Sequence, residues 1–306
     1  MTTSLFLTQL LNGLQLGLLL FLLSAGLTLV FGIMNFVNLA HGSLYMMGAY
    51  FAAEAFRWSG SFVAAGLIAV PATLVLGVVV ERIALARLYS RDHLDQVLTT
   101  FALILVFNEL VRAIWGSAAV YMNVPDALAG TIDMFGLPYS AYRLAIIGVG
   151  IAVGIGLYLL IHRTRVGMLI RAGASNGTMV AALGVNIGWL NTLVFGLGAA
   201  MAGLAGLIAG PILSVQPGMG EPILILTLVV IVTGGIGSIR GAFYGALIIG
   251  VVDTIGRAFL PGILREFFER TVAQAAGPAL ASMLIYVLMA VVLALRPQGL
   301  FPVKHG

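Results

Sequence analysis

The chain has 306 residues, of which 61% are hydrophobic and only 8% are charged, whereas about 25% of residues are charged in ordinary soluble domains. Its mean hydropathy of +1.11 excludes a water-soluble globular fold, because one core of this size cannot bury so much apolar surface. The net charge is +4. Since the arginines lie beside apolar runs, membrane topology explains this charge better than binding to nucleic acid does.

Missing residue types exclude further classes of site. The chain has no cysteine, which excludes disulfides, thiolate metal sites and cysteine nucleophiles. Its single lysine, Lys304, is followed by His305, so the chain lacks a Walker A loop, in which Ser or Thr follows the lysine. No two of the four histidines are close enough in sequence to share a helical face as a metal pair. We therefore expect no metal, no cofactor and no ATP-binding site in this chain.

The apolar residues form long runs, which is typical of transmembrane helices of about 20 residues and not of the short alternating strands of a barrel. The candidate runs are 7–31, 42–56, 62–80, 97–111, 144–161, 188–210, 222–236, 241–256 and 279–295. Several runs are short enough to be half-spans. We therefore expect an all-α, polytopic membrane bundle of eight or nine spans, forming a single domain over residues 1–306 because the connectors leave no room for a soluble domain.

The basic residues favour one orientation. An outside N-terminus places 9 of the 15 basic residues in the cytoplasm, in line with the positive-inside rule. These nine are Arg82, Arg87, Arg91, Arg163, Arg165, Arg171, Arg240, Arg296 and Lys304. A cleaved signal peptide is not expected, since residues 1–53 contain no Lys or Arg for a basic leader.

A first unusual segment, residues 31–50, carries polar side chains within an apolar stretch. Asn35, Asn38, His41 and Ser43 interrupt it. Unpaired polar groups at membrane depth cost several kcal/mol each, so we expect these side chains to face protein or a water-filled cavity. They are candidates for a translocation pathway. Spacing alone leaves a plain cytoplasmic turn between two spans as the alternative.

A second unusual segment, residues 233–245, is rich in glycine. Four glycines between positions 233 and 241 cannot sustain a stable helix, so we expect a break between two short apolar segments. An interrupted apolar segment in each half of a chain is a pointer to the pathway of a transporter. Gly234, Gly235 and Ser238 are therefore the second set of pathway candidates.

A third segment, residues 163–187, is too polar to span a membrane. Its apolar residues Met168, Leu169, Met179, Val180 and Leu183 predict a short helix or a helix pair. Apolar patches on a cytoplasmic helix suit a partner protein. A helix that lies on the lipid headgroups is the alternative that remains open.

Together these segments resemble the membrane subunits of branched-chain amino-acid ABC transporters, and the LivH-type subunit more than its LivM-like partner. The resemblance covers nearly the whole chain. Its motifs are Asn35-Phe36, Ala40-His41-Gly42, Tyr45-Met46, Gly48-Ala49-Tyr50, the glycine-rich stretch 234–238 with Gly241-Ala242, and the ending Arg296-Pro297-Gln298-Gly299-Leu300-Phe301.

The resemblance implies a permease that moves branched-chain or related amino acids across the bacterial inner membrane and is not itself an enzyme. The implied partners are a LivM-like second permease subunit, two ATP-binding subunits and an extracytoplasmic substrate-binding protein. In this family the cytoplasmic loop 163–187 couples to the ATPase. The matching positions here are Arg171, Ala174, Ala182, Leu183 and Gly184. The chain departs from the family at residues 175–177, where members often carry an acidic residue.

Two alternatives remain open. An ABC permease of the same type could carry urea, short-chain amides or another small neutral solute. An ion-coupled secondary transporter would instead need an ionisable group deep in the bundle. The candidates for such a group are Glu109 with Arg112, Asp253 with Arg257, and His41. Both acid–base pairs have helical spacing near predicted outer ends, where structural ion pairs are the simpler interpretation.

Overall fold

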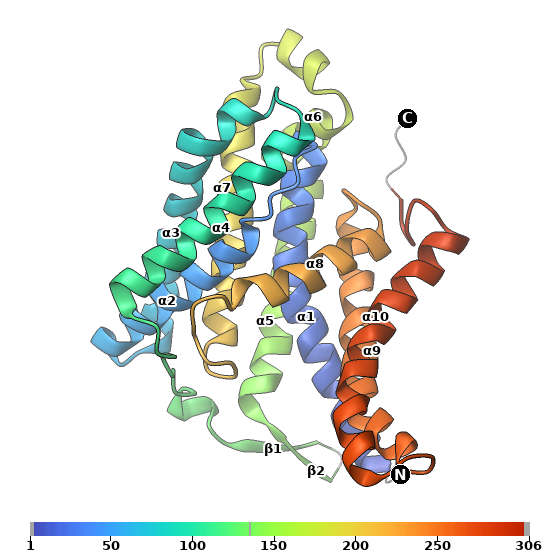
Figure 1. The fold of residues 1–306 in the computed structure, drawn as a ribbon. Helices are drawn as coiled ribbons and strands as arrows, with labels where there is room; N and C mark the ends of the chain where they lie inside the picture. Colours follow the sequence, from blue (N-terminus) through green and yellow to red (C-terminus); the bar gives the residue numbers. More distant parts are fainter. Residues whose placement is uncertain (1–2, 135, 303–306) are drawn as a thin grey trace. The chain divides into compact units, whose positions relative to one another are not determined.

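The computed structural model describes residues 3–134 and 136–302, so Lys304 and His305 lie outside the described residues (Figure 1). The described chain contains ten α-helices. They are α1 (Thr3–Met34), α2 (His41–Ser59), α3 (Phe62–Val80), α4 (His93–Trp115), α5 (Ala141–Arg163), α6 (Arg165–Ala182), α7 (Ile187–Ala209), α8 (Gly220–Gly234), α9 (Ile239–Leu264) and α10 (Arg270–Leu295).

Each of the nine predicted apolar runs corresponds to one helix, which confirms a helical membrane bundle. Among the described residues, seven helices are long and apolar enough to cross a membrane: α1, α3 with its continuation to Leu88, α4, α5, α7, α9 and α10. Of the nine helices that match a predicted run, α2 and α8 are outside this set, and α8 has only 15 residues. The described residues therefore hold seven candidate spans, and the expected count of eight or nine was too high. Helix α2 begins directly after one predicted chain break, and α8 ends directly before the other.

A short antiparallel hairpin, which the sequence analysis did not predict, precedes α5. Strands β1 (Thr131–Met134) and β2 (Leu137–Ser140) pair with Thr131 opposite Ser140. The hydroxyl of Tyr139 donates a hydrogen bond to Asn12 Oδ1 on α1 at 3.1 Å, and Arg143 donates to the same oxygen at 2.8 Å. Each strand has only four residues, the shortest length at which alternation predicts a strand.

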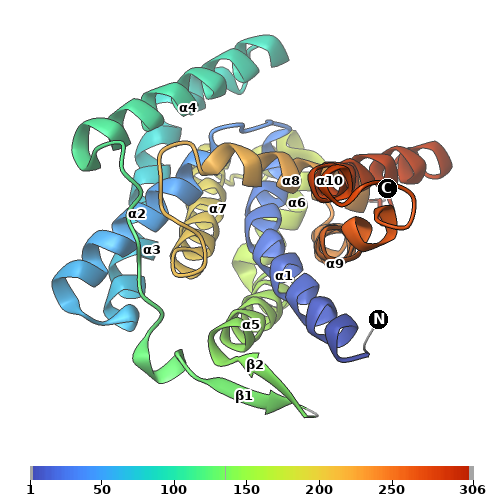
Figure 2. The same ribbon diagram turned by 60° about the horizontal axis from the view of Figure 1, so that its bottom comes forward.

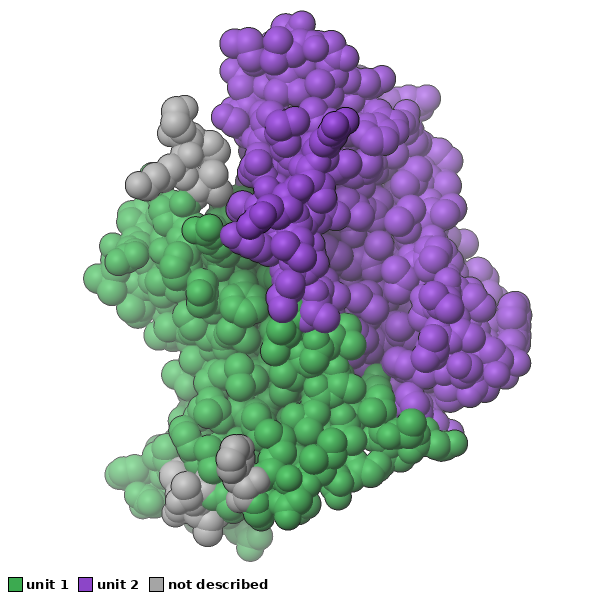
Figure 3. Space-filling model, turned by 180° about the vertical axis from the view of Figure 1, so that it is seen from behind, with its two compact units in different colours: residues 1–21, 126–151, 227–303 green, residues 22–125, 152–226, 304–306 purple. Residues whose placement is uncertain are grey.

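The described residues divide into two compact units, coloured separately in Figure 3. Unit 1 contains residues 3–21, 126–134, 136–151 and 227–302, and unit 2 contains residues 22–125 and 152–226. The divisions fall within α1, α5 and α8, and between Pro125 and Asp126 in the segment that follows α4. Each unit is described by itself.

In unit 2, helices α2, α3 and α7 pack through small residues and lie side by side in both ribbon views (Figures 1 and 2). A Cβ on Gly48 of α2 would lie 2.3 Å from the Cα of Gly203, and one on Gly206 would lie 2.2 Å from the carbonyl oxygen of Tyr45. Such approach requires glycine, because a methyl group would force the backbones apart. Close backbone packing is a common basis of helix association in lipid.

In unit 1, the first part of α1 packs against α9 in the same way. A Cβ on Gly250 would lie 2.4 Å from the backbone nitrogen of Gly17. The rings of Phe21 and Phe243 meet edge to face, with centroids 5.1 Å apart. Helices α9 and α10 also run side by side (Figure 2), with Gly277 of α10 seated against Pro261 of α9.

Candidate functional site: two chain breaks and a coupling helix

The first break separates α1 from α2 and lies wholly in unit 2. Asn35 has φ = 48°, and its N–H donates to the carbonyl of Phe31 at 2.9 Å. Asn tolerates this left-handed conformation better than most residues, because its short side chain can bond locally. Asn35 is exposed. Its observed role is therefore to end α1.

Asn38 and His41 are buried in this break and retain unused hydrogen-bonding atoms. Asn38 is 0% exposed; its Oδ1 accepts a hydrogen bond from the N–H of Ala40 at 3.0 Å, while its Nδ2 has no partner among the described residues. His41 Nε2 lies 3.2 Å from the carbonyl oxygen of Leu23. Since a carbonyl only accepts, Nε2 carries the proton, and Nδ1, which has no described partner, is free to accept.

The next turns of α2 carry further buried polar side chains. Ser43 is buried, and so is Tyr45, which follows His41 by four residues and therefore lies on the same helix face. The hydroxyls of Tyr45 and Tyr50 have no hydrogen-bond partner among the described residues. The sequence analysis used both tyrosines only as motif positions. A phenol inside an apolar run was the signal in the sequence that could have drawn attention to them.

The second break separates α8 from α9 and lies in unit 1. Gly235 and Gly237 have φ values of 114° and 80°, a region that glycine adopts without strain. Ser238 caps α9, because its hydroxyl accepts a hydrogen bond from the N–H of Gly241 at 3.0 Å. A Cβ on Gly234 would lie 2.1 Å from the carbonyl oxygen of Gly241. The predicted break is confirmed, and its glycines allow two backbones to cross.

The C-terminal motif closes this second break. The N–H of Leu300 donates to the carbonyl of Thr233 at 2.9 Å, and the N–H of Phe301 donates to the carbonyl of Gly234 at 2.8 Å. The Phe301 ring also stacks on Tyr244 of α9, with centroids 4.9 Å apart. Two motifs that the sequence analysis treated separately thus form one structural element.

The predicted pathway residues therefore form two sets. Asn35, Asn38, His41 and Ser43 belong to unit 2, whereas Gly234, Gly235 and Ser238 belong to unit 1. The first set carries hydrogen-bonding side chains, three of them buried. The second set consists of two glycines, which let the backbone turn and cross, and of Ser238, whose hydroxyl caps α9.

The predicted cytoplasmic loop is a helix pair. Helix α6 is interrupted at Asn176, whose φ and ψ of −155° and 89° are not helical. Each part has its own cap: Thr164 Oγ1 accepts from the N–H of Gly167 at 3.0 Å, and Asn176 Oδ1 accepts from the N–H of Met179 at 2.9 Å. The structure confirms the predicted form of this segment.

The first part of α6 is fastened to neighbouring helices. Gly167 sits directly against the carbonyls of Leu160 and Ile161 at the end of α5, and the Arg171 guanidinium donates a hydrogen bond to the Ile161 carbonyl. A cation at a helix C-terminus is favoured by the helix dipole. The observed contact of Arg171 is therefore with α5 itself.

The second part of α6 presents apolar side chains at its surface. Leu183 is 77% exposed, and Met179 is also exposed. Ala182 and Gly184 are exposed beside them, whereas Ala174 is partly buried. Gly184 has φ = 88° and ends the helix in the left-handed conformation typical of a C-terminal glycine.

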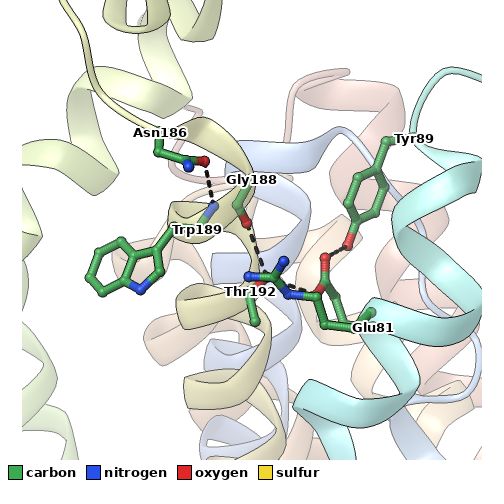
Figure 4. Close-up of polar contacts among 7 residues, drawn as sticks. Glu81, Tyr89, Asn186, Gly188, Trp189 and Thr192 are labelled. Atoms are coloured by element: carbon green, nitrogen blue, oxygen red, sulfur yellow. Dashed lines mark hydrogen bonds and ion pairs between the residues drawn. The ribbon is translucent and has the colours of Figure 1, made fainter.

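A buried carboxylate lies at the junction of α3 and α7 (Figure 4). Glu81 is 1% exposed and begins the π-helical turn Glu81–Leu85 that follows α3. Its Oε1 accepts a hydrogen bond from the Tyr89 hydroxyl at 2.9 Å, and its Oε2 accepts one from the Thr192 hydroxyl at 2.8 Å. Arg82 Nε lies 3.6 Å from Oε2. Several partners offset the cost of burying this charge.

The same junction includes the start of α7. Asn186 Oδ1 accepts from the N–H of Trp189 at 3.0 Å and so caps α7, as Figure 4 shows. Burial, together with the Glu81 carboxylate, raises the pKa of Tyr89, so its hydroxyl stays protonated and remains a donor. Glu81 was not predicted from the sequence, since an acid at the end of an apolar run indicates topology before it indicates a buried contact.

The acid–base pairs considered for ion coupling form on their own helices. Arg257 Nε lies 3.0 and 2.8 Å from the two carboxylate oxygens of Asp253, and Arg112 donates to Glu109. Among the described residues, the buried acids are Glu81 and Asp253, and both are paired. These contacts agree with the structural interpretation of both pairs.

A protein-family model described as "Branched-chain amino acid transport system / permease component" matches residues 9–293. The chain belongs to this permease family. It is 30% identical to the high-affinity branched-chain amino acid transport system permease protein BraD of Pseudomonas aeruginosa, over 96% of this chain and 95% of that protein. It is also 30% identical to the corresponding permease protein LivH of Escherichia coli, over 83% and 87% of the two chains.

A solved structure extends the likeness to the fold. An ABC transporter assigned to the metal-chelate type, in an inward-facing conformation, matches with a TM-score of 0.50 and 18% sequence identity, covering 93% of this chain and 85% of that chain. The permease therefore has an ABC importer permease-like fold. It is a multi-pass membrane protein and a transport component, not an enzyme, and as part of an ABC system it works with an ATPase and other transporter components.

Proposed function

We propose that this permease pairs with a LivM-like second permease subunit and is driven by two ATP-binding subunits. In this proposal it receives branched-chain or related amino acids from an extracytoplasmic binding protein. The observation that carries the proposal is the family match over residues 9–293, together with relatives that align over most of their length. The whole chain acts as one permease domain.

In this proposal the two chain breaks line the route of the solute. Asn35, Asn38, His41 and Ser43 supply the polar surface, and Gly234, Gly235 and Ser238 supply a thin wall of backbone. Support comes from Asn38 Nδ2 and His41 Nδ1, which are buried and lack partners among the described residues. A buried group without a partner costs about 1–3 kcal/mol. A passing solute with donors and acceptors of its own would offset that cost.

Helix α6 acts in this proposal as the coupling helix, and residues 163–187 are the coupling loop. Arg171 and Ala174 hold its first part in place, while Ala182, Leu183 and Gly184 meet the ATPase. Support comes from the exposed apolar end of α6 and from the short linker to α7. Movement of α6 passes to α7, and the Thr192–Glu81 bond transmits it to α3. Alternating access follows when ATP binding and hydrolysis shift the population between two states of the bundle.

The experiment is uptake of labelled leucine, urea and acetamide by the complete transporter in proteoliposomes. We expect leucine uptake that requires ATP and the loaded binding protein and that persists when proton and sodium gradients are collapsed. Uptake that follows an ion gradient without ATP would contradict the proposal. Uptake of urea or acetamide in preference to leucine would keep the ABC mechanism and replace the substrate.

A further inference from the structure

Unit 2 contains a cavity of about 590 Å³ between the ends of α2 and α4 and the chain that follows α4. Its lining includes Tyr50, Glu54, Arg57, Ile114, Trp115 and Asn123. None of the proposed pathway or coupling residues lines it. Cavities that hold small molecules typically measure about 300–1,000 Å³ and combine apolar walls with a few polar groups.

Two side chains of opposite charge line the cavity. Arg57 and Glu54 form an ion pair one turn apart on α2, with an N–O distance of 2.5 Å; the Arg57 side chain is 72% exposed and that of Glu54 is 22% exposed. An exposed pair of this kind contributes about 0–1 kcal/mol. A ligand that carries both charges can therefore replace the pair at little cost, because guanidinium groups bind carboxylates well and Glu54 can accept from an ammonium group.

Other side chains of the lining are aromatic or apolar. The rings of Tyr50 and Trp115 lie 5.0 Å apart between centroids, and Ile114 is beside Trp115 on α4. Tyr50 is 0% exposed, and its hydroxyl has no hydrogen-bond partner among the described residues. The Tyr50 and Trp115 rings therefore give this part of the lining an apolar surface.

We propose that this cavity binds one zwitterionic α-amino acid with an apolar side chain. The ligand carboxylate lies on Arg57, its ammonium group lies on Glu54, and its side chain lies against Tyr50 and Trp115. The inference rests on the proposed function and adds a second site to it. In the predicted orientation the cavity is at the outer end of α2, so the site would receive the solute before it enters the route.

The test uses the purified permease with Trp115 as a fluorescent reporter. The other two tryptophans are replaced by W58F and W189F. We expect leucine to change Trp115 emission saturably. Isovalerate, which lacks the ammonium group, and isoamylamine, which lacks the carboxylate, should each bind at least tenfold more weakly. An equal response to isovalerate, or no saturable response to leucine, would overturn the proposal.

Exchanging the charges of Glu54 and Arg57 tests leucine binding separately from the stability of α2. The double variant E54R/R57E keeps an ion pair of the same spacing but reverses its direction, and we expect it to lose leucine binding. The matched control is E109R/R112E, which exchanges a pair of the same spacing and the same 2.5 Å N–O distance on α4, outside the cavity lining; it should bind leucine normally. Unchanged binding by E54R/R57E would refute the site. If that variant does not fold, E54Q and R57Q serve instead, each with an expected tenfold loss.

Leucine uptake by the complete transporter distinguishes failure of the proposed function from failure of the cavity proposal. If the wild-type transporter does not import leucine with ATP, the proposed function fails. If it does, and E54R/R57E imports leucine with an unchanged KM, the inference alone fails. A third outcome is that the exchange abolishes complex formation with the binding protein while Trp115 never responds to leucine. That result would assign the cavity to protein docking and overturn the proposal.

Discussion

The two chain breaks solve the same problem with different chemistry. A chain that leaves a helix within an apolar segment must satisfy its freed backbone groups inside the protein. The break before α9 does so with backbone from the C-terminal segment, through Leu300 and Phe301. The break before α2 uses a side chain of its own, since Asn38 accepts from Ala40.

As a result, the two breaks differ in which buried polar atoms have no hydrogen-bond partner among the described residues. In the first break, Asn38 Nδ2 and His41 Nδ1 are buried without described partners. In the second, the unpartnered atom is the Thr233 hydroxyl, which lies on α8 and not among the glycines. A chain break between two helices need not therefore bind a solute. We expect substitutions in the first break to affect transport and those in the second to affect mainly folding.

The largest effect is expected for Gly234→Val. Its Cβ would lie 2.1 Å from the carbonyl oxygen of Gly241, so α8 and α9 cannot keep their crossing. We expect almost no monodisperse protein in size-exclusion chromatography. The control is Gly148→Ala on α5, where a Cβ meets nothing within 4 Å, and which should fold normally. Folded Gly234→Val protein would show that the second break tolerates opening.

The next effect is expected from ending the chain at Pro297. This truncation removes the two N–H donors that satisfy the Thr233 and Gly234 carbonyls. Each lost partner of a buried group costs about 1–3 kcal/mol, so we expect a clearly lower melting temperature. The control is Phe301→Ala, which removes only the ring and keeps both backbone hydrogen bonds. It should lower the melting temperature less than the truncation does. A truncated protein as stable as the full chain would contradict the closure.

Gly184→Pro tests the coupling helix instead of a break. Proline requires φ near −65°, whereas Gly184 has φ = 88° and donates its N–H to the Ala181 carbonyl at 3.0 Å. We expect normal membrane insertion but no ATP-driven leucine uptake. The control is Gly177→Ala, where a Cβ meets nothing within 4 Å. Uptake at the wild-type rate by Gly184→Pro would refute the coupling role.

His41→Gln tests whether the first break serves transport and not folding. The Gln amide can still donate to the Leu23 carbonyl, but it has no acceptor in the place of Nδ1. We expect leucine uptake per folded transporter to fall about tenfold, which corresponds to about 1.4 kcal/mol, while the melting temperature changes little. An equal loss of stability and uptake would instead assign His41 to packing.

The smallest effect is expected for Ser238→Ala, which removes the cap of α9. Loss of an N-cap costs about 1 kcal/mol, measured as a lower melting temperature of the purified permease. Ser238→Asn retains a capping side chain and should restore most of the stability. A melting temperature unchanged in Ser238→Ala would show that the cap does not stabilise the second break.

Much of the fold was predictable because lipid imposes long apolar helices and penalises irregular backbone. The nine runs, both breaks and the helix pair of α6 were all visible as local patterns. The span count was not, since α2 and α8 contain predicted apolar runs but are not among the seven helices long and apolar enough to cross a membrane. The hairpin 131–140 was missed because its two strands have four residues each, the shortest length at which alternation predicts a strand.

The missed parts of the site depend on pairings between distant residues. Leu300 and Phe301 close a break some 65 residues earlier in the chain, and Glu81 meets Thr192 across 111 residues. Backbone pairing leaves no residue signature, and a carboxylate at the end of a span resembles an ordinary topological charge. Only the folded chain brings these groups together.

The central claim is that the first break and the start of α2, which carries Ser43, line a route for the solute. Because the chain has no cysteine, a single Ser43→Cys can be followed on this chain by mass spectrometry after treatment with a methanethiosulfonate reagent. Ala65→Cys, fully buried in unit 2, is the control. We predict that Ser43→Cys in the assembled transporter is modified during ATP turnover and that loaded binding protein changes its rate. Modification no faster than that of Ala65→Cys in every state would contradict the account.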